Sequence, residues 1–319
     1  MGTYMITGGA GMVGRQLSRL LLARGDQVVI LDVVPAAKLS DDVRDRVTLV
    51  RADLANWAEV MEAVASTRPD TIFHIAALMP PMSERNHSAA WGINVDGTMH
   101  ILEAARHFGV GKVIYSSTTA TFAPNLPDLV PNDHPQFPTM LYGVTKVCSE
   151  RLGEYYYRRY GVDFRGVRFL SILGPGRVPG SGWSAYTSLV IEECAGGNPY
   201  VIKVNEDLRL RFIYVKDAAL SLMKLAAATA DRLTARVYNL DGFSASTREL
   251  VDGVLRDVPD ARISWEFDPE YQRVMDTQYG VIQHEMDDSL ARQDWDWAVT
   301  YARDEAIHDF IQDVRHGLS

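Results

Sequence analysis

Short runs of apolar residues alternate with longer segments whose apolar residues recur at helical spacing over the first 170 residues. The short runs predict strands at residues 3–7, 27–32, 47–51, 71–74, 112–116 and 163–169. The longer segments predict helices at residues 14–24, 57–66, 89–108 and 145–160. Because strands alternate with helices, we expect a Rossmann-like, doubly wound α/β fold with a parallel sheet covered on both faces.

The pattern changes after residue 170. The stretch "SILGPGRVPGSGWS" is rich in glycine and proline and predicts a loop. Helices are predicted beyond it at residues 184–195, 217–228 and 303–316, and strands at 212–215 and 236–240. We therefore expect a first domain over residues 1–170, to which segments near 212–240 return. Most of residues 171–319 should form a smaller mixed α/β lobe.

Composition and charge narrow the class of protein. Hydrophobic residues make up 47% of the chain and charged residues 23%, which is typical of a globular protein. The net charge of -9 argues against partners such as nucleic acid or an anionic membrane. No apolar stretch approaches the roughly 20 residues that span a bilayer, and glycines interrupt any leader from residue 8. The two isolated cysteines, Cys148 and Cys194, predict a cytoplasmic protein without a metal site.

Three glycines mark the junction between the first predicted strand and the first helix. Gly8, Gly11 and Gly14 form the pattern G-x-x-G-x-x-G. This spacing is typical of a turn that brings backbone close to a pyrophosphate and lets helix and strand pack tightly. The helix that follows begins near Met12 and Val13, where free N–H groups can bind the anion. The pattern therefore predicts a dinucleotide site.

Residues at the ends of the next three strands complete this predicted site. Asp32 ends the second strand, 18 residues after Gly14, and an acid there accepts hydrogen bonds from ribose and repels a 2′-phosphate. We therefore expect NAD rather than NADP. Further predicted cofactor contacts are Asp53 and Leu54 at the adenine, and Ala76, Ala77 and Leu78 beside the pyrophosphate and ribose. Asp53 is equally suited to capping the next helix, and His74 is predicted to pack inside the sheet.

Tyr142 and Lys146 lie four residues apart, which places them on one face of a helix. A cation beside a tyrosine lowers its pKa from about 10, so the pair can act as a general base. Upstream, residues 116–119 form a hydroxyl cluster from which Ser116 and Thr118 are predicted to face the site. At least two of these four hydroxyls should serve turns. Asn94, like Ser116, Tyr142 and Lys146, is also predicted to contact the cofactor; it is predicted either to hold a kink or water near Lys146 or to cap a helix.

With these motifs, nearly the whole chain resembles the extended short-chain dehydrogenase/reductase superfamily, also called the NAD-dependent epimerase/dehydratase family. The resemblance assigns the family Ser/Thr to Thr118, with Ser117 in reserve, and implies that Tyr142 removes a hydroxyl proton while hydride passes to NAD. Lys146 would also hold the nicotinamide ribose. The implied activity is oxidation or reduction of a secondary alcohol on a small polar substrate, such as a hydroxy-amino acid or sugar acid. Alternatives are an NAD-dependent sugar or nucleotide-sugar epimerase and a non-catalytic NAD-binding regulator.

Within the superfamily, three stretches are similar to the short-chain type of L-threonine 3-dehydrogenase: "MLYGVTKVCSERLGEYYYRRYGVDFRGVRF", "YNLDGFSASTRELVDGV" and "DDSLARQDWDW". Arg209 stands where that group has an arginine. Departures fall where substrate should bind, because Trp183 and Ser184 replace two threonines, and "LMPPMSERN" contains Met82 and Ser83 where the group has small residues and a serine. These five residues and Thr118 are the predicted substrate contacts, whereas "GPG" at 174–176 resembles the sugar-nucleotide branch.

The helices predicted at residues 89–108 and 145–160 carry apolar residues on more than one side, and residues 155–160 read "YYYRRY". Relatives commonly pair these two helices into a four-helix bundle. The resemblance thus implies a homodimer. The alternative is that these aromatic side chains pack under the C-terminal lobe.

Overall fold

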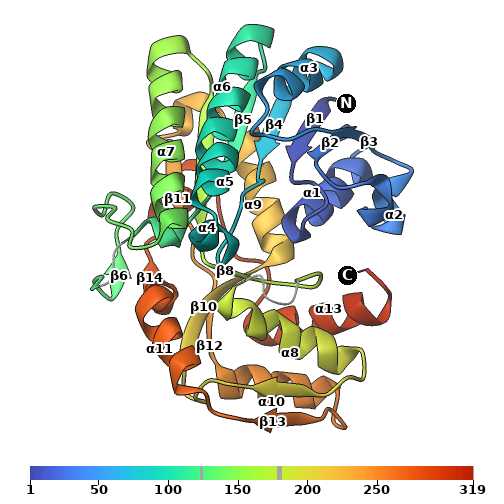
Figure 1. Ribbon diagram of the computed structural model, residues 1–319, viewed down its shortest axis with the longest axis vertical. Helices are drawn as coiled ribbons and strands as arrows, with labels where there is room; N and C mark the ends of the chain where they lie inside the picture. Colours follow the sequence, from blue (N-terminus) through green and yellow to red (C-terminus); the bar gives the residue numbers. More distant parts are fainter. Residues whose placement is uncertain (123–124, 178–181, 319) are drawn as a thin grey trace.

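The computed structural model describes residues 1–122, 125–177 and 182–318. A seven-stranded sheet forms the upper part of the molecule, in the order β11-β7-β5-β4-β1-β2-β3 (Figure 1). Its strands are β1 (Thr3–Thr7), β2 (Gln27–Asp32), β3 (Thr48–Arg51), β4 (Thr71–His74), β5 (Lys112–Thr118), β7 (Phe164–Phe169) and β11 (Val237–Asn239). All neighbouring strands run parallel, which confirms the predicted doubly wound sheet.

Helices cover both faces of this sheet, as the continuously apolar strands predict. They are α1 (Met12–Ala23) and α9 (Val215–Ala227) on one face, and α3 (Trp57–Thr67), α6 (Gly97–Phe108) and α7 (Leu141–Tyr160) on the other (Figure 1). Successive side chains of β1 point to opposite faces. Ile6 therefore packs in the core with Leu17 of α1, whereas Met5 packs in the core with Ile101 of α6.

The remaining chain forms a smaller lobe below the sheet in Figure 1. Its central sheet has the order β12-β10-β8, and β9 pairs with β13 at the outer edge. The elements are β8 (Ser171–Leu173), α8 (Tyr186–Ala195), β9 (Tyr200–Ile202), β10 (Arg209–Tyr214), β12 (Phe243–Ser246), α10 (Thr247–Asp257), β13 (Ile263–Trp265), α11 (Pro269–Gln278) and α13 (Arg303–Arg315). Of the segments near 212–240, α9 and β11 pack with the large sheet, but β10 belongs to the lobe.

Several elements begin or end elsewhere than the sequence pattern predicts. The helix expected over residues 89–108 is divided into α5 (His87–Trp91), a π-helical turn η2 (Gly92–Asp96) and α6. β5 continues through Thr118, and α7 begins at Leu141, so Tyr142 lies in its first turn. The pattern does not predict the short elements α2 (Asp41–Arg44), α4 (Met82–Arg85), β6 (Leu129–Val130), β14 (Glu285–Met286) and α12 (Ser289–Trp295).

The order of strands reverses on the two sides of β1, because β2 and β3 lie on one side and β4 and β5 on the other. Such a switch point opens a crevice at the carboxyl ends of the strands, where open α/β sheets bind ligands. The lobe packs against this edge. Across the described ranges 1–122, 125–177 and 182–318, no helix is both long and apolar enough to cross a membrane.

Candidate active site

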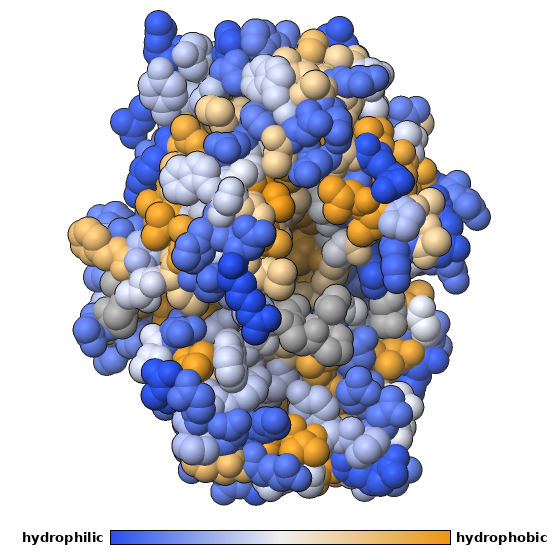
Figure 2. Space-filling model, in the orientation of Figure 1, coloured by the Kyte–Doolittle hydropathy of each residue, from blue (hydrophilic) through white to orange (hydrophobic). Residues whose placement is uncertain are grey.

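A cavity of about 630 Å³ lies between the carboxyl edge of the large sheet and the lobe. Figure 2 shows a hollow on this face of the molecule, with hydrophobic residues on its wall. Every predicted cofactor residue lines the cavity except Asn94, and so does the predicted catalytic residue Thr118. The fold thus brings together residues from position 8 to position 146 at one site.

The glycine turn packs too closely for larger residues at two of its positions. Gly8 has a φ of +69°, and a Cβ there would lie 2.8 Å from the Cα of Ala76. A Cβ on Gly14 would lie 2.6 Å from backbone of the turn itself. α1 begins directly after Gly11, which provides no side-chain cap, so its first N–H groups are free to bind an anion. This cradle fits a pyrophosphate.

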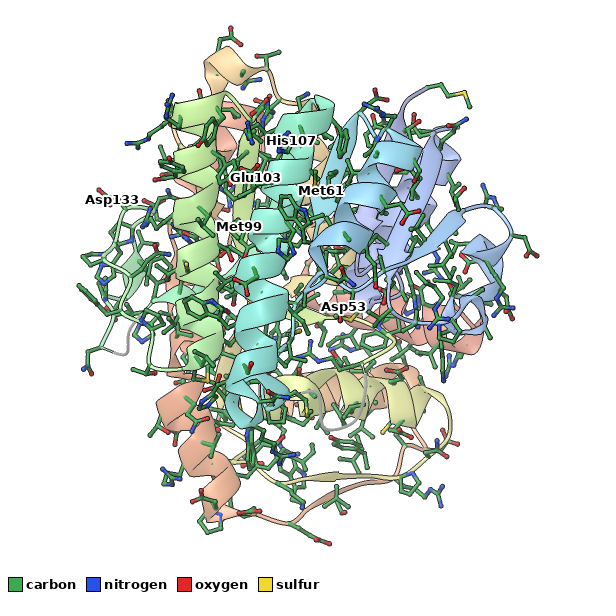
Figure 3. The ribbon with its side chains drawn as sticks, turned by 45° about the horizontal axis from the view of Figure 1, so that its top comes forward. Asp53, Met61, Met99, Glu103, His107 and Asp133 are labelled. Carbon is green, nitrogen blue, oxygen red and sulfur yellow. The ribbon has the colours of Figure 1, made fainter. Side chains whose placement is uncertain are left out.

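Two carboxylates line the part of the cavity that is formed by the ends of β2 and β3. Asp32 is held by N–H groups, because its Oδ2 accepts from Ala10 at 3.2 Å and its Oδ1 from Val34 at 3.3 Å. Asp53 (labelled in Figure 3) accepts the N–H of Ala55 at 2.9 Å. The helix cap considered for Asp53 is instead supplied by Asn56, whose side chain accepts from the first turn of α3. An acid fixed at the end of β2 fits the ribose of an adenosine.

The side chain of Asn94 braces the cavity wall instead of lining it. Its Oδ1 accepts the N–H of Leu78 at 2.7 Å, and its Nδ2 donates to the carbonyl of Leu78 and to Thr145 Oγ1, each at 3.1 Å. The residue lies in the π-helical turn η2, so the predicted kink is present and the helix-cap alternative is wrong. Asn94 thereby positions Leu78, which lines the cavity, and its direct contact with the cofactor stays a prediction.

Tyr142 and Lys146 lie one turn apart on α7 and both line the cavity. Lys146 Nζ donates to the carbonyl of Ser116 at 2.7 Å and lies 5.7 Å from the centre of the Tyr142 ring. Thr118 Oγ1 accepts the N–H of Ala120 at 3.2 Å, which fixes the hydroxyl at the cavity wall. The reserve choice, Ser117, donates to Glu150 at 2.5 Å, so its hydroxyl is already committed and the geometry favours Thr118.

Burial dominates the protonation of this pair. Burial lowers the pKa of Lys146 to about 7, and the nearby Glu150 carboxylate counteracts part of this change by raising the pKa. Burial raises the pKa of Tyr142 above its ordinary value, and the positive charge of Arg177 counteracts this rise. The sequence predicts that Lys146 lowers the pKa of Tyr142, but in the structure Lys146 is bonded to Ser116 and the cation with this effect is Arg177. The phenol therefore keeps its proton at neutral pH in the free protein.

The N-terminus of α7 is capped by a carboxylate from elsewhere in the chain. Met140 at its N-cap provides no side-chain hydrogen bond. Glu84 of α4, 57 residues upstream, accepts the N–H of Leu141 at 3.1 Å and of Tyr142 at 3.0 Å. Ser83 is buried and donates to Glu84 at 3.1 Å. Sequence analysis missed Glu84 because neither its spacing nor its surroundings point to residue 142.

The predicted substrate residues divide into two groups. Thr118 and Ser184 line the cavity. Met82, Ser83, Trp183 and Arg209 are not among the residues that line it, and their contact with substrate stays a prediction. Met82 is 51% exposed and Ser83 supports Glu84.

Trp183 and Arg209, which also lie outside the cavity wall, are held by neighbours within the lobe. Trp183 packs edge-on against Tyr271, with ring centres 4.7 Å apart. Arg209 is exposed and pairs with Glu249 at 3.1 Å. A sequence places a residue in a loop or at a strand end, but the direction of its side chain depends on packing that the sequence does not display.

In their place, the lobe contributes Ser171, Arg177, Gln278 and Tyr279 to the cavity wall. Ser171 begins β8 and Arg177 follows the "GPG" loop, while Gln278 and Tyr279 end α11. The sequence does predict that loops 79–87, 174–186 and 276–286 choose the substrate, and Arg177, Gln278 and Tyr279 lie in two of them, but none of the four residues has a local signal of its own. They meet Tyr142 because the lobe closes over the sheet edge.

Comparison with known proteins places this geometry in a family. The model of the NAD dependent epimerase/dehydratase family matches residues 4–241. The mitochondrial L-threonine 3-dehydrogenase of Bos taurus is 31% identical over 296 residues, which cover 92% of this chain and 77% of that enzyme. The solved L-threonine 3-dehydrogenase of Trypanosoma brucei is 30% identical with a TM-score of 0.89, over 99% of this chain and 98% of that one.

A solved UDP-glucose 4-epimerase of Thermotoga maritima has a TM-score of 0.84 over 99% of this chain and 100% of that one. It is 19% identical and so shows a shared fold only. The glycine turn, Asp32, Thr118, Tyr142 and Lys146 all meet at one cavity. With the family match over residues 4–241, the chain belongs to the NAD dependent epimerase/dehydratase family and is an NAD-dependent dehydrogenase or epimerase.

Proposed function

We propose that this protein oxidises, and in reverse forms, a secondary alcohol on a small polar substrate such as a hydroxy-amino acid or a sugar acid. The observation that carries this proposal is the convergence of Thr118, Tyr142 and Lys146 on the cavity that also contains the glycine turn. The similar enzymes at 30–31% identity are L-threonine dehydrogenases, which favours net oxidation.

Each residue has a distinct task in this proposal. Thr118 binds the reacting hydroxyl, and the Tyr142 oxygen removes its proton. NAD, when bound, supplies the acceptor for the hydride that leaves the alcohol carbon. Lys146 holds the nicotinamide ribose. Because burial keeps the phenol protonated in the free protein even beside Arg177, the positive nicotinamide ring must lower the pKa of Tyr142 in the complex.

The second candidate is an epimerase, in which hydride leaves the substrate and returns to the opposite face. The "GPG" loop supports it, because Gly176 of this loop lines the cavity and the loop resembles the sugar-nucleotide branch. The third possibility, a regulator that binds NAD without catalysis, gives no reason for Thr118, Tyr142 and Lys146 to line one cavity.

The test is incubation of the purified protein with NAD and a panel of hydroxy-amino acids, sugar acids and nucleotide sugars. Accumulation of NADH, followed by absorbance, supports a dehydrogenase. Formation of epimerised product without NADH would contradict the dehydrogenase and support the epimerase. NAD binding without turnover of any compound in the panel favours the regulator.

We also propose a division of labour between the two parts of the chain. Residues 1–170 with α9 and β11 bind the cofactor, and most of residues 171–319 bind substrate. The cavity between them supports this division, since its glycine turn comes from the first part and Arg177 and Tyr279 come from the second. Substitutions at Tyr279 should then change the KM for substrate and leave the Kd for NAD unaltered.

A homodimer through a four-helix bundle of α6 and α7 is a further part of the proposal. Met99, Glu103 and His107 follow one face of α6 (Figure 3). Val144 and Tyr155 are exposed on the neighbouring α7, at 40% and 53%. Tyr155 contacts Tyr156 and Tyr160 at the end of α7, away from the lobe. Light scattering should give a mass twice that of the 35.5 kDa chain. For Val144→Asp, the measured mass should fall to that of the monomer.

We propose a cytoplasmic location on the basis of Cys148 and Cys194, which are both free. Free thiols persist in reducing compartments. The mammalian relatives carry the word mitochondrial in their names, so cell fractionation should compare these two compartments.

A further inference from the structure

Two buried polar atoms on the lobe side of the cavity have no hydrogen-bond partner among the residues that the structure describes. They are Ser171 Oγ and Arg177 Nε. Ser171 is 9% exposed, and both residues line the cavity. The other unpartnered buried side-chain atoms of the described chain belong to residues outside the cavity wall. Because native proteins pair almost all buried polar groups, two unpartnered atoms on residues of one cavity wall indicate a polar ligand there.

The charges around Arg177 indicate the sign of that ligand. The cavity-lining residues that carry carboxylates, among those the structure describes, are Asp32 and Asp53 at the ends of β2 and β3. Arg177 instead lines the cavity together with Tyr142 and Tyr279, and its positive charge counteracts the burial that raises the pKa of each tyrosine. A guanidinium without a carboxylate partner favours an anion.

Two glutamates of nearby elements, Glu192 and Glu84, already accept hydrogen bonds from backbone N–H groups. Glu192 of α8 accepts the N–H of Gly176 at 3.1 Å, so it holds the backbone of the loop that presents Arg177. Glu84 caps α7 through Leu141 and Tyr142. Glu192 thus fixes the loop, while the Arg177 side chain lines the same cavity as Tyr142.

We propose that Arg177, assisted by the hydroxyl of Ser171, binds an anionic group of the substrate beside the carbon that is oxidised at Tyr142. The substrate is then a secondary alcohol that also carries a carboxylate, whose two oxygens match the planar fork of a guanidinium. This inference rests on the proposed function and narrows its substrate class. It assigns recognition of the acid group to Arg177 and not to Arg209, which lies outside the cavity and pairs with Glu249.

The first experiment compares an acid with its neutral derivative. Steady-state kinetics with L-threonine and L-threonine methyl ester separate the charge from the alcohol. For Arg177→Met, we expect the KM for the acid to rise about tenfold to a hundredfold, while the KM for the ester changes little. Arg177→Lys keeps the positive charge but lacks the planar guanidinium, so its KM for the acid should lie between those of the wild type and Arg177→Met. Ser171→Ala should cause a smaller rise, and Arg209→Met is the matched control that should cause none.

A second measurement does not depend on turnover. Malonate should raise the melting temperature of the wild-type protein–NAD complex and should fail to do so with Arg177→Met. Isothermal titration of each variant with NAD then identifies the source of the anion. An unchanged Kd for NAD supports a substrate subsite, whereas a tenfold weaker Kd would mean that Arg177 binds a cofactor phosphate, and this outcome overturns the inference.

The two proposals fail in different ways. If the panel of alcohols gives no turnover but malonate still binds through Arg177, the proposed oxidation is wrong and the anion subsite stands. If acids and neutral alcohols are oxidised equally well and Arg177→Met changes both alike, the oxidation stands and the anion subsite is wrong. Loss of malonate binding in Arg209→Met alone would also contradict the assignment to Arg177.

Discussion

The two ends of the cavity are built in different ways. The cofactor end uses the glycine turn after β1 and the residues that follow β2, β3 and β4, all within the first 78 residues. The catalytic end combines Thr118, Tyr142, Arg177 and Tyr279, with Glu84 behind them. A site made by successive strand ends follows from local pattern, whereas a site made by a lobe closing over a sheet depends on long-range contacts. The predictions below test this contrast.

The largest effect should come from Tyr142→Phe, which tests the catalytic end alone. Removal of the phenolic oxygen takes away the general base, and we expect kcat to fall by about a thousandfold. The Kd for NAD should change by less than about twofold, because the binding residues of the cofactor end remain. Stopped-flow kinetics measure the loss of turnover, and a binding titration measures the Kd for NAD.

Tyr157→Phe on the same helix is the matched control, since this tyrosine is partly exposed and lies outside the cavity. Turnover in Tyr142→Phe equal to that of the wild type would exclude Tyr142 as the base. It would also remove the contrast between the two ends.

Asp32→Asn tests the cofactor end alone. Replacing an ionised acceptor for two ribose hydroxyls should weaken NAD binding by about tenfold to a hundredfold. Without the charge that repels a 2′-phosphate, the preference for NAD over NADP should narrow. Isothermal titration with both cofactors measures this. Asp45→Asn, on the exposed surface, is the control. If the wild type prefers NADP, the role of Asp32 is wrong.

Glu84→Ala tests whether a residue outside the cavity tunes the catalytic end. Without the carboxylate, the N–H groups of Leu141 and Tyr142 lose their partner, and loss of a cap costs about 1 kcal/mol. We expect kcat to fall by roughly threefold to tenfold, and the pH profile of kcat should shift toward acid, because loss of a negative charge near Tyr142 favours the phenolate.

Glu84→Gln, which keeps one acceptor oxygen, should recover part of this activity. The exposed Glu62→Gln is the matched control. A purely structural role would lower the melting temperature and leave the pH profile of kcat unmoved, which would contradict a positioning role for Glu84.

The smallest effect near neutral pH concerns His74 at the end of β4. It is buried between Thr7 Oγ1 at 2.8 Å and Thr98 Oγ1 at 3.0 Å, and burial lowers its pKa to about 3. Between pH 6.5 and about 3, the unfolded chain binds a proton that the folded protein does not. The free energy of unfolding should therefore fall by about 1.4 kcal/mol for each pH unit below 6.5 through this residue alone.

Urea unfolding at pH 7.5, 6.5, 5.5 and 4.5 measures this slope. His74→Gln should reduce it, while the exposed His316→Gln should not. Equal slopes in all three proteins would mean that His74 titrates inside the fold, and the packing beneath the cofactor end would then be looser than the structure indicates.

Sequence analysis succeeded where the signal is local. The glycine spacing and Asp32 predict the cofactor end because each follows a strand that the apolar pattern identifies. Tyr142 and Lys146 were found by helical spacing, although the helix begins at Leu141 and not at residue 145. That earlier start depends on Glu84, which no local pattern connects to this helix.

It failed where a side chain has more than one possible direction. Arg209 and Arg177 are both arginines on lobe segments, but Arg209 pairs with Glu249 on the surface whereas Arg177 enters the cavity. Asn94 does lie at a kink and donates to Thr145, next to Lys146, but no local pattern shows that its amide also binds the backbone of Leu78. Ser83 and Trp183 also serve neighbouring residues within the protein.

The sequence by itself determined the alternation of strands and helices, the glycine turn that fits a dinucleotide and the spacing of the proposed general-base pair. Each of these depends on residues within one βα unit or one helical turn. Only the tertiary structure decided what meets the substrate, because the lobe brings Ser171, Arg177 and Tyr279 to the sheet edge from segments 100 or more residues apart. Their directions follow from close packing between layers, which no short stretch of sequence encodes.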